Sequence, residues 1–432
     1  YISSHGVTHD TKTNKGNFKI HNMIISSVKS NFKIIIFGFV FTFFSCIGQS
    51  FFIGLFNSSI RTELNITHGE FGVIYGVATL SSSLMLIWLG KKIDDLKLIN
   101  YSFFVVIFLS LAALFFSFIN GLIFLFIGIF FLRLSGQGLM AHTASVAISR
   151  FFDRSRGKAL SYAWVGMSLG EFFLPIAIVY LLTFMYWRNL WQGFSIIIIL
   201  LLPIFIYFTV KEIKTSSREK DNKNSFSQNF EKIKSWKRKE VLKDLKFYSI
   251  LPAMLASSFI ITGIVINQTF IIESKGWEKF SIAKAFMVYA ALTLLSLFIS
   301  GFLVDKFTSR KLFPLLNAPL LLSLIVLAIF DHPISVFVFM GLMGISNGLT
   351  NVLMTSFWAE IYGVNYLGSI KALTGSLMVF STALATVVFG LLIDFGYSIE
   401  RIAFSCSIYV AISIVIVVIF KKIYRPVLEN KT

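Results

Sequence analysis

Twelve apolar stretches, each long enough to cross a lipid bilayer, constrain this chain more than any other feature. A membrane-spanning helix needs about 20 predominantly apolar residues. The stretches cover residues 33–56, 71–90, 99–119, 121–147, 159–184, 187–210, 247–272, 282–304, 311–330, 333–357, 369–394 and 401–420. Backbone groups in lipid must pair within their own segment, so stretches of this length are helices. The sequence therefore predicts an all-α polytopic membrane protein with twelve transmembrane helices.

The overall composition agrees with a chain that lies mostly in lipid. Hydrophobic residues make up 56% of it and charged residues only 14%, whereas soluble domains contain roughly 25% charged residues. The net charge of +18 could indicate a nucleic-acid partner. The basic residues, however, lie in short segments beside the apolar stretches, which is typical of loops that orient a membrane protein. We therefore expect the lipid bilayer as a partner and no nucleic acid.

No pattern in the sequence predicts catalysis, a cofactor or a metal site. Cys46 and Cys406 both lie inside apolar stretches, where cysteine is usually a small hydrophobic residue. The stretch "GMSLG" at 166–170 matches the Gly-x-Ser-x-Gly pattern of serine hydrolases, but that motif needs a strand, a sharp turn and a helix. Here it falls inside an apolar helix. We expect no enzyme activity, no cofactor and no metal.

A polar segment divides the chain into two halves. Residues 211–246 are strongly basic and follow the sixth apolar stretch. The predicted organisation is therefore a tail at 1–32, a six-helix half at 33–210, a basic linker at 211–246, a second six-helix half at 247–420 and a tail at 421–432. The linker allows two interpretations. Its later part could form an amphipathic helix on the membrane surface, or the whole could be a solvated linker. The apolar residues of such a helix are Phe230, Ile233, Trp236, Val241 and Leu245.

The distribution of basic residues predicts the orientation in the membrane. Cytoplasmic loops carry an excess of Lys and Arg. If both termini are cytoplasmic, nearly all of the 39 basic residues lie in the tails, the linker or loops on that side. Arg133 falls inside a helix, and the remaining six lie in loops on the opposite side: Arg61, Arg188, Lys275, Lys279, Lys284 and Arg401. We expect an integral, multi-pass protein of the plasma (inner) membrane with both termini in the cytoplasm.

Two short charged loops indicate that the second half repeats the first. "GKKIDDLK" at 90–97 joins the second and third helices, and "GFLVDKFTSRK" at 301–311 joins the eighth and ninth. Both begin with Gly, three residues and Asp, namely Gly90 with Asp94 and Gly301 with Asp305. Gly lets two helices approach closely, and a carboxylate at the membrane edge can meet the positive N-terminal end of a neighbouring helix.

These loops, with the six-plus-six division, resemble the major facilitator superfamily. Members have twelve helices in two six-helix halves, and each half carries a loop Gly-x-x-x-Asp-(Arg/Lys)-x-Gly-Arg-(Arg/Lys). The second loop matches at Gly301, Asp305, Lys306, Arg310 and Lys311, with Ser309 where Gly is usual, whereas the first lacks the basic end. The resemblance implies that Gly90, Asp94, Gly301, Asp305 and Arg310 take part in gating. It also implies that Asp94 meets the start of helix 11 near Ser369 and Asp305 the start of helix 5 near Lys158.

Two ionisable residues lie near the middle of neighbouring predicted helices. Arg133 is in the fourth helix and Glu171 in the fifth, at similar depth. An intramembrane charge usually faces a partner or a wet cavity, so each is the expected partner of the other. Either the pair fixes the two helices structurally, or Arg133 receives an anion while Glu171 carries a proton. Gln137 lies one helical turn beyond Arg133 and on its face.

The second half offers uncharged polar residues for the same cavity. They are Asn267 and Gln268 in the seventh helix and Asn347 and Asn351, four apart, in the tenth. The stretches at 149–160 and 368–396 resemble bacterial carriers of the monocarboxylate and oxalate/formate type. Carriers of that type usually place an acid and an arginine in the eighth helix, which here has no charge beyond Lys284 near its start.

The sequence thus predicts a secondary active transporter whose halves alternately expose a central site. We expect a small-molecule substrate that is an organic anion such as a monocarboxylate, a proton as coupling ion, and a monomer. Arg133, Gln137, Asn267, Gln268, Asn347 and Asn351 are the candidate substrate-binding residues, with Glu171 for proton coupling. One alternative is proton-coupled efflux of amphipathic or drug-like compounds. Another is a polytopic sensor that transports nothing.

Overall fold

A computed structural model describes residues 32–152, 156–210, 234–363 and 366–425 of the chain. Within these ranges the protein is all helical and contains 12 helices long and apolar enough to cross a membrane. The predicted fold class is therefore confirmed. The spans begin at Phe32–Gly54 and end at Ile399–Ile423, within a few residues of the predicted stretches.

The first half contains six spans. Residues 32–45 are helical and lead into a short 3₁₀ turn, η1, and the other elements follow in chain order. They are η1 (Cys46–Gly48), α2 (Ser50–Gly54), α3 (Asn57–Leu64), α4 (His68–Asp95), α5 (Leu98–Phe116), α6 (Leu122–Leu132), the π-helix η2 (Arg133–Met140), α7 (Ala141–Phe151), α8 (Arg156–Leu181) and α9 (Trp187–Val210). The fourth span is continuous through α6, η2 and α7.

The second half repeats this plan. Its elements are α10 (Arg238–Val241), α11 (Leu245–Ile266), α12 (Gln268–Lys275), α13 (Lys279–Phe307), α14 (Ser309–Leu312), η3 (Phe313–Leu315), α15 (Ala318–Ile329), α16 (Ser335–Tyr362), α17 (Leu367–Asp394), α18 (Ile399–Phe420) and η4 (Lys421–Ile423). The halves meet mainly along α4 with α17 and α8 with α13, and α2 also contacts α11.

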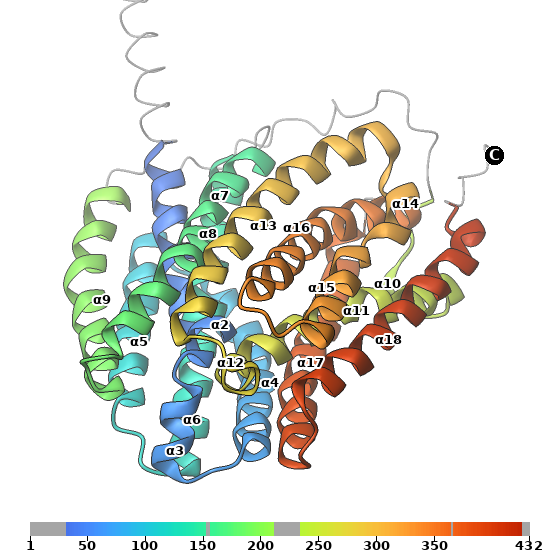
Figure 1. The fold of residues 1–432 in the computed structure, drawn as a ribbon. Helices are drawn as coiled ribbons and strands as arrows, with labels where there is room; N and C mark the ends of the chain where they lie inside the picture. The colour runs from blue at the N-terminus through green and yellow to red at the C-terminus, as the bar shows by residue number, and fades with distance from the viewer. Residues whose placement is uncertain (1–31, 153–155, 211–233, 364–365, 426–432) are drawn as a thin grey trace, which may run out of the picture.

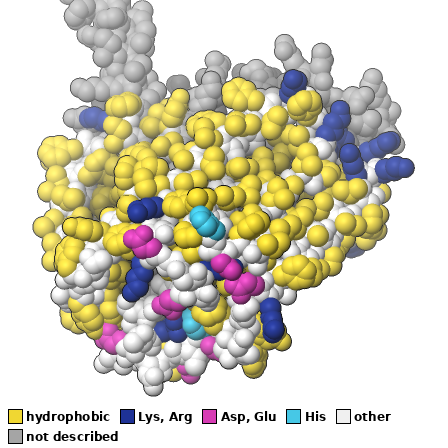
Figure 2. Space-filling view, viewed as in Figure 1, with side chains coloured by type: hydrophobic (Ala, Val, Ile, Leu, Met, Phe, Trp, Pro, Cys, Tyr) yellow, Lys and Arg dark blue, Asp and Glu magenta, His cyan; other side chains and the backbone are white. Residues whose placement is uncertain are grey.

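The two ends of the bundle differ in what they carry (Figure 1). We call the upper end, where the described chain starts at Phe32 and where α9 and α18 finish, the terminal end. We call the other, where α3 and the α17–α18 turn lie, the opposite end. Figure 2 shows a broad apolar belt on one face, with acidic and basic side chains gathered below it at the opposite end. Such a belt suits a protein surrounded by lipid.

Local sequence explains how α4 starts at the opposite end. The Thr67 hydroxyl accepts a hydrogen bond from the Glu70 backbone N–H at 3.1 Å, and the Glu70 carboxylate accepts one from Thr67 N–H at 2.8 Å. This reciprocal capping box satisfies two donors that a helix start leaves without an intrahelical partner. The start of α4 is therefore fixed where α17 ends beside it.

The first and seventh spans are both interrupted. Gln49 is extended, with φ −83° and ψ 155°, and separates η1 from α2. Asn267, with φ −100° and ψ 22°, separates α11 from α12. Interrupted transmembrane helices leave backbone groups free of intrahelical bonds, and in transporters they typically lie near the transported solute.

The described end of the basic linker contacts the second half. Trp236 N–H donates to Tyr362 O at 2.9 Å, and the two rings lie edge to face with centroids 5.5 Å apart. Helix α10 is only four residues long, so Trp236, Val241 and Leu245 do not share one amphipathic helix. This part of the surface-helix prediction is wrong, because the Tyr362 backbone and ring hold the segment against the bundle. Phe230 and Ile233 lie outside the described residues.

Candidate functional site

Arg133 lies at the start of the π-helix η2 and is 2% exposed. Its Nη1 donates to Gly48 O at 3.1 Å and to Ser50 Oγ at 3.3 Å, on either side of the break at Gln49. Its guanidinium lies 5.3 Å from the centroid of the Tyr75 ring, and the Tyr75 hydroxyl donates to Ser50 Oγ at 2.9 Å. The arginine therefore binds the carbonyl that the interrupted first span exposes. Its buried Nε has no hydrogen-bond partner among the described residues.

Two glycines allow this close contact between the first and fourth spans. A Cβ on Gly136 would lie 2.6 Å from Gly48 N, and one on Gly48 would lie 2.3 Å from Leu132 O. Neither position has room for a larger residue. Gln137 follows in the same π-helix and is half-buried. Residues in π-helical turns are often functional, since the wider turn changes where side chains point.

Glu171, in the middle of α8, is 9% exposed. It lies within electrostatic reach of Cys46 in the first span and of Tyr289 in α13. Among the described residues, Glu171 has neither an ion pair nor a hydrogen bond. The expected pairing with Arg133 is therefore wrong. Arg133 contacts the first span at Gly48 and Ser50, whereas Glu171 interacts electrostatically with Cys46 of that span.

The second half adds polar groups near Glu171. Asn347 in α16 donates from Nδ2 to the Tyr289 hydroxyl at 2.9 Å, and Tyr289 is 4% exposed. Asn351 lies one turn further along α16 and is exposed. Glu171, Tyr289 and Asn347 thus come from three helices of both halves and form one polar group inside the bundle.

Asn267 and Gln268 lie at the break of the seventh span, where they face the first. Asn267 Nδ2 donates to Gly263 O of its own span at 3.0 Å. Gln268 Nε2 donates across the halves to Phe51 O at 3.1 Å. In return, Asn57 Nδ2 donates to Ile266 O at 2.7 Å. The two interrupted spans are therefore joined by reciprocal amide-to-backbone hydrogen bonds.

The second contact between the halves is the close packing of α4 on α17. Asp394 at the end of α17 accepts hydrogen bonds from His68 N–H at 3.0 Å and Gly69 N–H at 2.7 Å. Further along, Thr386 Oγ1 donates to Gly72 O at 2.9 Å, and a Cβ on Gly72 would lie 2.1 Å from Thr386 O. The hydrogen bonds between the halves that are described above belong to these two contacts. They lie toward the opposite end, which is therefore the closed one.

At the terminal end, the predicted gating residues contact their own half. Asp94 accepts from Arg150 Nη2 at 2.7 Å, so the expected contact near Ser369 is not made in this conformation. The Gly90 carbonyl oxygen accepts a hydrogen bond from His142 Nε2 at 3.1 Å. A Cβ added to Gly90 would lie 3.3 Å from the same nitrogen. Gly90 thus makes room for the His142 ring.

The second-half loop has a different arrangement. Glu360 at the end of α16 accepts from the backbone N–H groups of Ser309 at 2.8 Å and Arg310 at 3.1 Å, and from Arg310 Nε at 3.3 Å. Nothing lies within 4 Å of a Cβ placed on Gly301. Asp305 belongs to α13, but its side chain lies outside the described part of the structure, as does that of Lys158.

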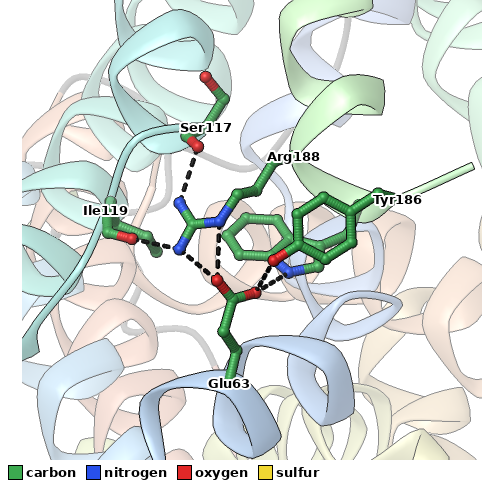
Figure 3. A network of polar contacts seen from close by, with 6 residues as sticks. Glu63, Ser117, Ile119, Tyr186 and Arg188 are labelled. Atoms are coloured by element: carbon green, nitrogen blue, oxygen red, sulfur yellow. Dashed lines mark hydrogen bonds and ion pairs between the residues drawn. The ribbon is translucent and has the colours of Figure 1, made fainter.

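Loops at the opposite end of the first half converge on Glu63 (Figure 3). Its Oε1 accepts from Arg188 at 2.7 and 2.9 Å, and its Oε2 accepts from Trp187 Nε1 at 2.6 Å and from the Tyr186 hydroxyl. Burial raises the pKa of Glu63, but the hydrogen bonds from Tyr186, Arg188 and Trp187 outweigh it and lower the pKa below 4.5. Arg188 also donates to Ser117 O and Ile119 O, so three loops are joined.

The second half has a corresponding network around Lys275, whose side chain is 0% exposed. Its Nζ contacts Asp331 Oδ1 at 2.5 Å and Glu400 Oε1 at 2.9 Å. Trp277 Nε1 donates to Asp331 O at 2.7 Å. The loop after α12, the turn before α16 and the start of α18 are thereby held together.

Sequence reasoning missed four residues that the structure brings into the site: Ser50, Tyr75, Tyr289 and Asp394. Each left a signal that was not used. The polar stretch "GQS" at 48–50 interrupts an apolar run, and a tyrosine inside an apolar helix usually needs a partner for its hydroxyl. Asp394 is a carboxylate at a helix end, where a neighbouring helix start can bind it.

The fold and site define a class, a polytopic helical transporter built from two six-helix halves around interrupted helices. The model of the Major Facilitator Superfamily matches residues 38–386. The chain belongs to this superfamily and is an integral, multi-pass membrane protein, a secondary transporter. No curated protein matches the sequence.

Solved structures share the fold at low sequence identity. One is a bacterial homologue of the human lysosomal transporter Spinster, in an inward-facing and unoccupied conformation. It aligns with a TM-score of 0.65 and 14% identity over 91% of this chain and 96% of its own. The nucleoside transporter NupG aligns with a TM-score of 0.67 and 13% identity over 92% of this chain and 100% of its own.

Proposed function

We propose that this transporter carries a small organic anion, such as a monocarboxylate, by alternating access coupled to a proton. One observation carries the proposal. Arg133 and Glu171 are both buried inside the bundle, and no ion pair joins them. An ionisable side chain is expensive inside a membrane and is usually retained there for function.

Arg133 is the anion-binding residue of this proposal. Its hydrogen bonds to Gly48 O and Ser50 Oγ use Nη1, whereas no described residue accepts a hydrogen bond from Nε. Neither of those acceptors carries a formal charge, so the positive charge is not neutralised. A carboxylate would supply both the missing acceptor and the missing charge. Gln137, in the same π-helix, and Gln268, at the other interrupted span, would contribute uncharged hydrogen bonds, together with Asn267 and Asn351.

Glu171 is the proton carrier of this proposal. Nothing in the described residues pairs with its carboxylate, so protonation removes a buried negative charge at no cost in lost contacts. Tyr289 and Asn347 lie on the other half of the molecule. A change in the charge of Glu171 would therefore act across the boundary where the halves move.

The orientation and assembly belong to the same proposal. Both termini are cytoplasmic and the protein is a monomer in the plasma membrane. The excess of Lys and Arg at the terminal end supports this orientation. The conformation described here, closed at the opposite end, would then face inward.

Uptake into proteoliposomes with an imposed inward proton gradient tests the proposal. The panel contains small monocarboxylates, dicarboxylates, a nucleoside and cationic dyes, and Arg133→Gln and Glu171→Gln are measured beside the wild type. We expect gradient-driven carboxylate uptake that Arg133→Gln abolishes. Glu171→Gln should retain exchange of carboxylate for carboxylate but lose the response to the gradient.

Another outcome would replace this function with the alternative. If carboxylates are ignored and dyes are expelled, the protein is an efflux transporter. Arg133 would then serve only to hold the interrupted first span. Correct folding of both variants is checked by their elution as a single species and by their melting temperature.

A further inference from the structure

A cavity of about 630 Å³ lies at the closed, opposite end of the molecule. Neither Arg133 nor Glu171 lines it, and of the residues proposed to bind the anion only Gln268 does. The first half contributes α3 and the end of α8, and the second contributes α12 and the start of α13. Sites for small molecules are typically concave and about 300–1,000 Å³ in volume. The volume of this cavity lies within that range, even though the contacts around the cavity hold the two halves together.

The cavity wall is mostly apolar with a few polar atoms that need a partner. Leu55, Val179, Leu182 and Ile282 are among its apolar residues. Gln268, which is 1% exposed, also lines it. Because Gln268 Nε2 donates to Phe51 O, its Oε1 points elsewhere, and that buried oxygen accepts no hydrogen bond.

The next residue adds a second unpartnered oxygen. Thr269 also lines the cavity, and its buried Oγ1 has no hydrogen-bond partner in the part of the chain that the structure describes. A buried polar atom without a hydrogen bond is costly. The two residues that carry these oxygens both line the cavity, so a rotation of either side chain would offer the oxygen to a bound molecule that donates a hydrogen bond.

Charge restricts the class of molecule further. Glu63 lines the cavity, but Arg188 already neutralises it. Glu273 and Lys279 are exposed and of opposite sign. The wall thus has no net charge, so it offers a charged ligand nothing to offset the loss of its hydration.

We propose that this cavity is a second binding site, for an uncharged amphipathic molecule that carries an O–H or N–H donor. Its apolar part contacts the end of α8 and the start of α13, and its donor binds Gln268 Oε1 or Thr269 Oγ1. Since both halves line the cavity, an occupant contacts both and stabilises the conformation that is closed at this end.

Photolabelling of the purified full-length transporter in nanodiscs tests this site. The probe is 4-azidobenzyl alcohol, and the matched control is 4-azidotoluene, which lacks the hydroxyl. Labelled peptides are identified by mass spectrometry. We expect the alcohol to label peptides from residues 179–187 and 268–282, at a half-saturating concentration about five- to tenfold lower than the control, as one buried hydrogen bond would give.

Three variants make the test specific. Leu182→Trp fills the cavity and should abolish labelling of these peptides. Leu200→Trp, the same change at an exposed position of α9, should leave it unchanged. Thr269→Val keeps the side-chain shape but removes the hydroxyl. It should therefore remove much of the difference in half-saturating concentration between the alcohol and the control probe.

The site is refuted if the two probes label these peptides equally, or if folded Leu182→Trp is labelled like the wild type. If Leu182→Trp does not fold, Thr269→Val decides the question. Neither readout depends on transport, so a failed carboxylate assay would not affect the result.

Discussion

Glu63 and Lys275 hold equivalent positions in the two halves, with opposite charge. Glu63 contacts Arg188 at the start of α9, and Lys275 contacts Glu400 near the start of α18. The separation in sequence between Glu63 and Lys275 equals that between Arg188 and Glu400. Each network also includes the loop between the third and fourth spans of its half, through Ile119 O or Asp331. The internal repeat has thus preserved the geometry of the contact and reversed its charges.

Glu63→Gln should destabilise the transporter by about 1–3 kcal/mol at neutral pH, because a charged acceptor of several hydrogen bonds is lost. The lowered pKa of Glu63 gives the sign of the pH dependence. Its stabilisation is present above about pH 4.5, the usual pKa, and disappears as the pH falls through the lower folded value.

Melting temperatures of wild type and Glu63→Gln, measured from pH 7 down to pH 3, check this prediction. The difference between them should be largest at neutral pH and narrow under acid conditions. Asp95→Asn, an exposed carboxylate at the terminal end, is the control and should melt like the wild type. A pH-independent difference would show that the charge of Glu63 is not what stabilises the loops.

Lys275→Met should be more damaging than Glu400→Gln. The first variant leaves both Asp331 and Glu400 without their cation, so two ion pairs are lost at once. The second leaves Lys275 paired with Asp331. Melting temperatures of the two variants should rank in that order, and equal losses would contradict the shared-cation arrangement.

Gly72→Ala should open the end that is closed here, because its Cβ would overlap Thr386 O. Gly193→Ala is the matched control: a Cβ there meets nothing within 4 Å, so the change should be neutral or slightly stabilising. The reporter is Thr79→Cys in a background that lacks Cys46 and Cys406. Thr79 lies on α4 and is 2% exposed. Its rate of reaction with a membrane-impermeant thiosulfonate should rise in Gly72→Ala and not in Gly193→Ala.

Asp305→Asn should reduce transport by about fivefold without reducing expression, the effect of losing one carboxylate from a helix N-terminus. Asp95→Asn again serves as the control, because it removes an exposed carboxylate from the first-half loop at a position that is not among the predicted gating residues. Initial uptake rates per molecule of reconstituted protein give the measurement. Unchanged uptake by a well-expressed Asp305→Asn would remove this residue from the gating mechanism.

The sequence was sufficient to predict the membrane spans but not the breaks within them. Length and apolarity predict a transmembrane helix, because lipid forces every backbone group to pair. The breaks at Gln49 and Asn267 involve no proline, and what stabilises them comes from elsewhere in the chain. Arg133 binds the carbonyl of Gly48, while Gln268 and Asn57 bind carbonyls of the facing span.

The polar residues show the same limit. Similar depth suggested that Arg133 and Glu171 would pair, but depth does not fix the direction in which each helix presents its side chain. Ser50 and Tyr75, which contact Arg133, are distant from it in sequence, and so is Tyr289 from Glu171, which it influences electrostatically. Such contacts depend on how the helices rotate and pack against one another. The periodicity of apolar residues within a single helix does not specify this.

The two loop networks also have a consequence for assembly. Every contact of Glu63, Arg188, Lys275 and Glu400 described above stays within one six-helix half. Each half is thus fastened by its own side chains and needs no covalent link to its neighbour for that purpose. Two polypeptides, one ending after Val210 and one beginning before Lys234, should therefore associate in a membrane into the same molecule when they are produced together.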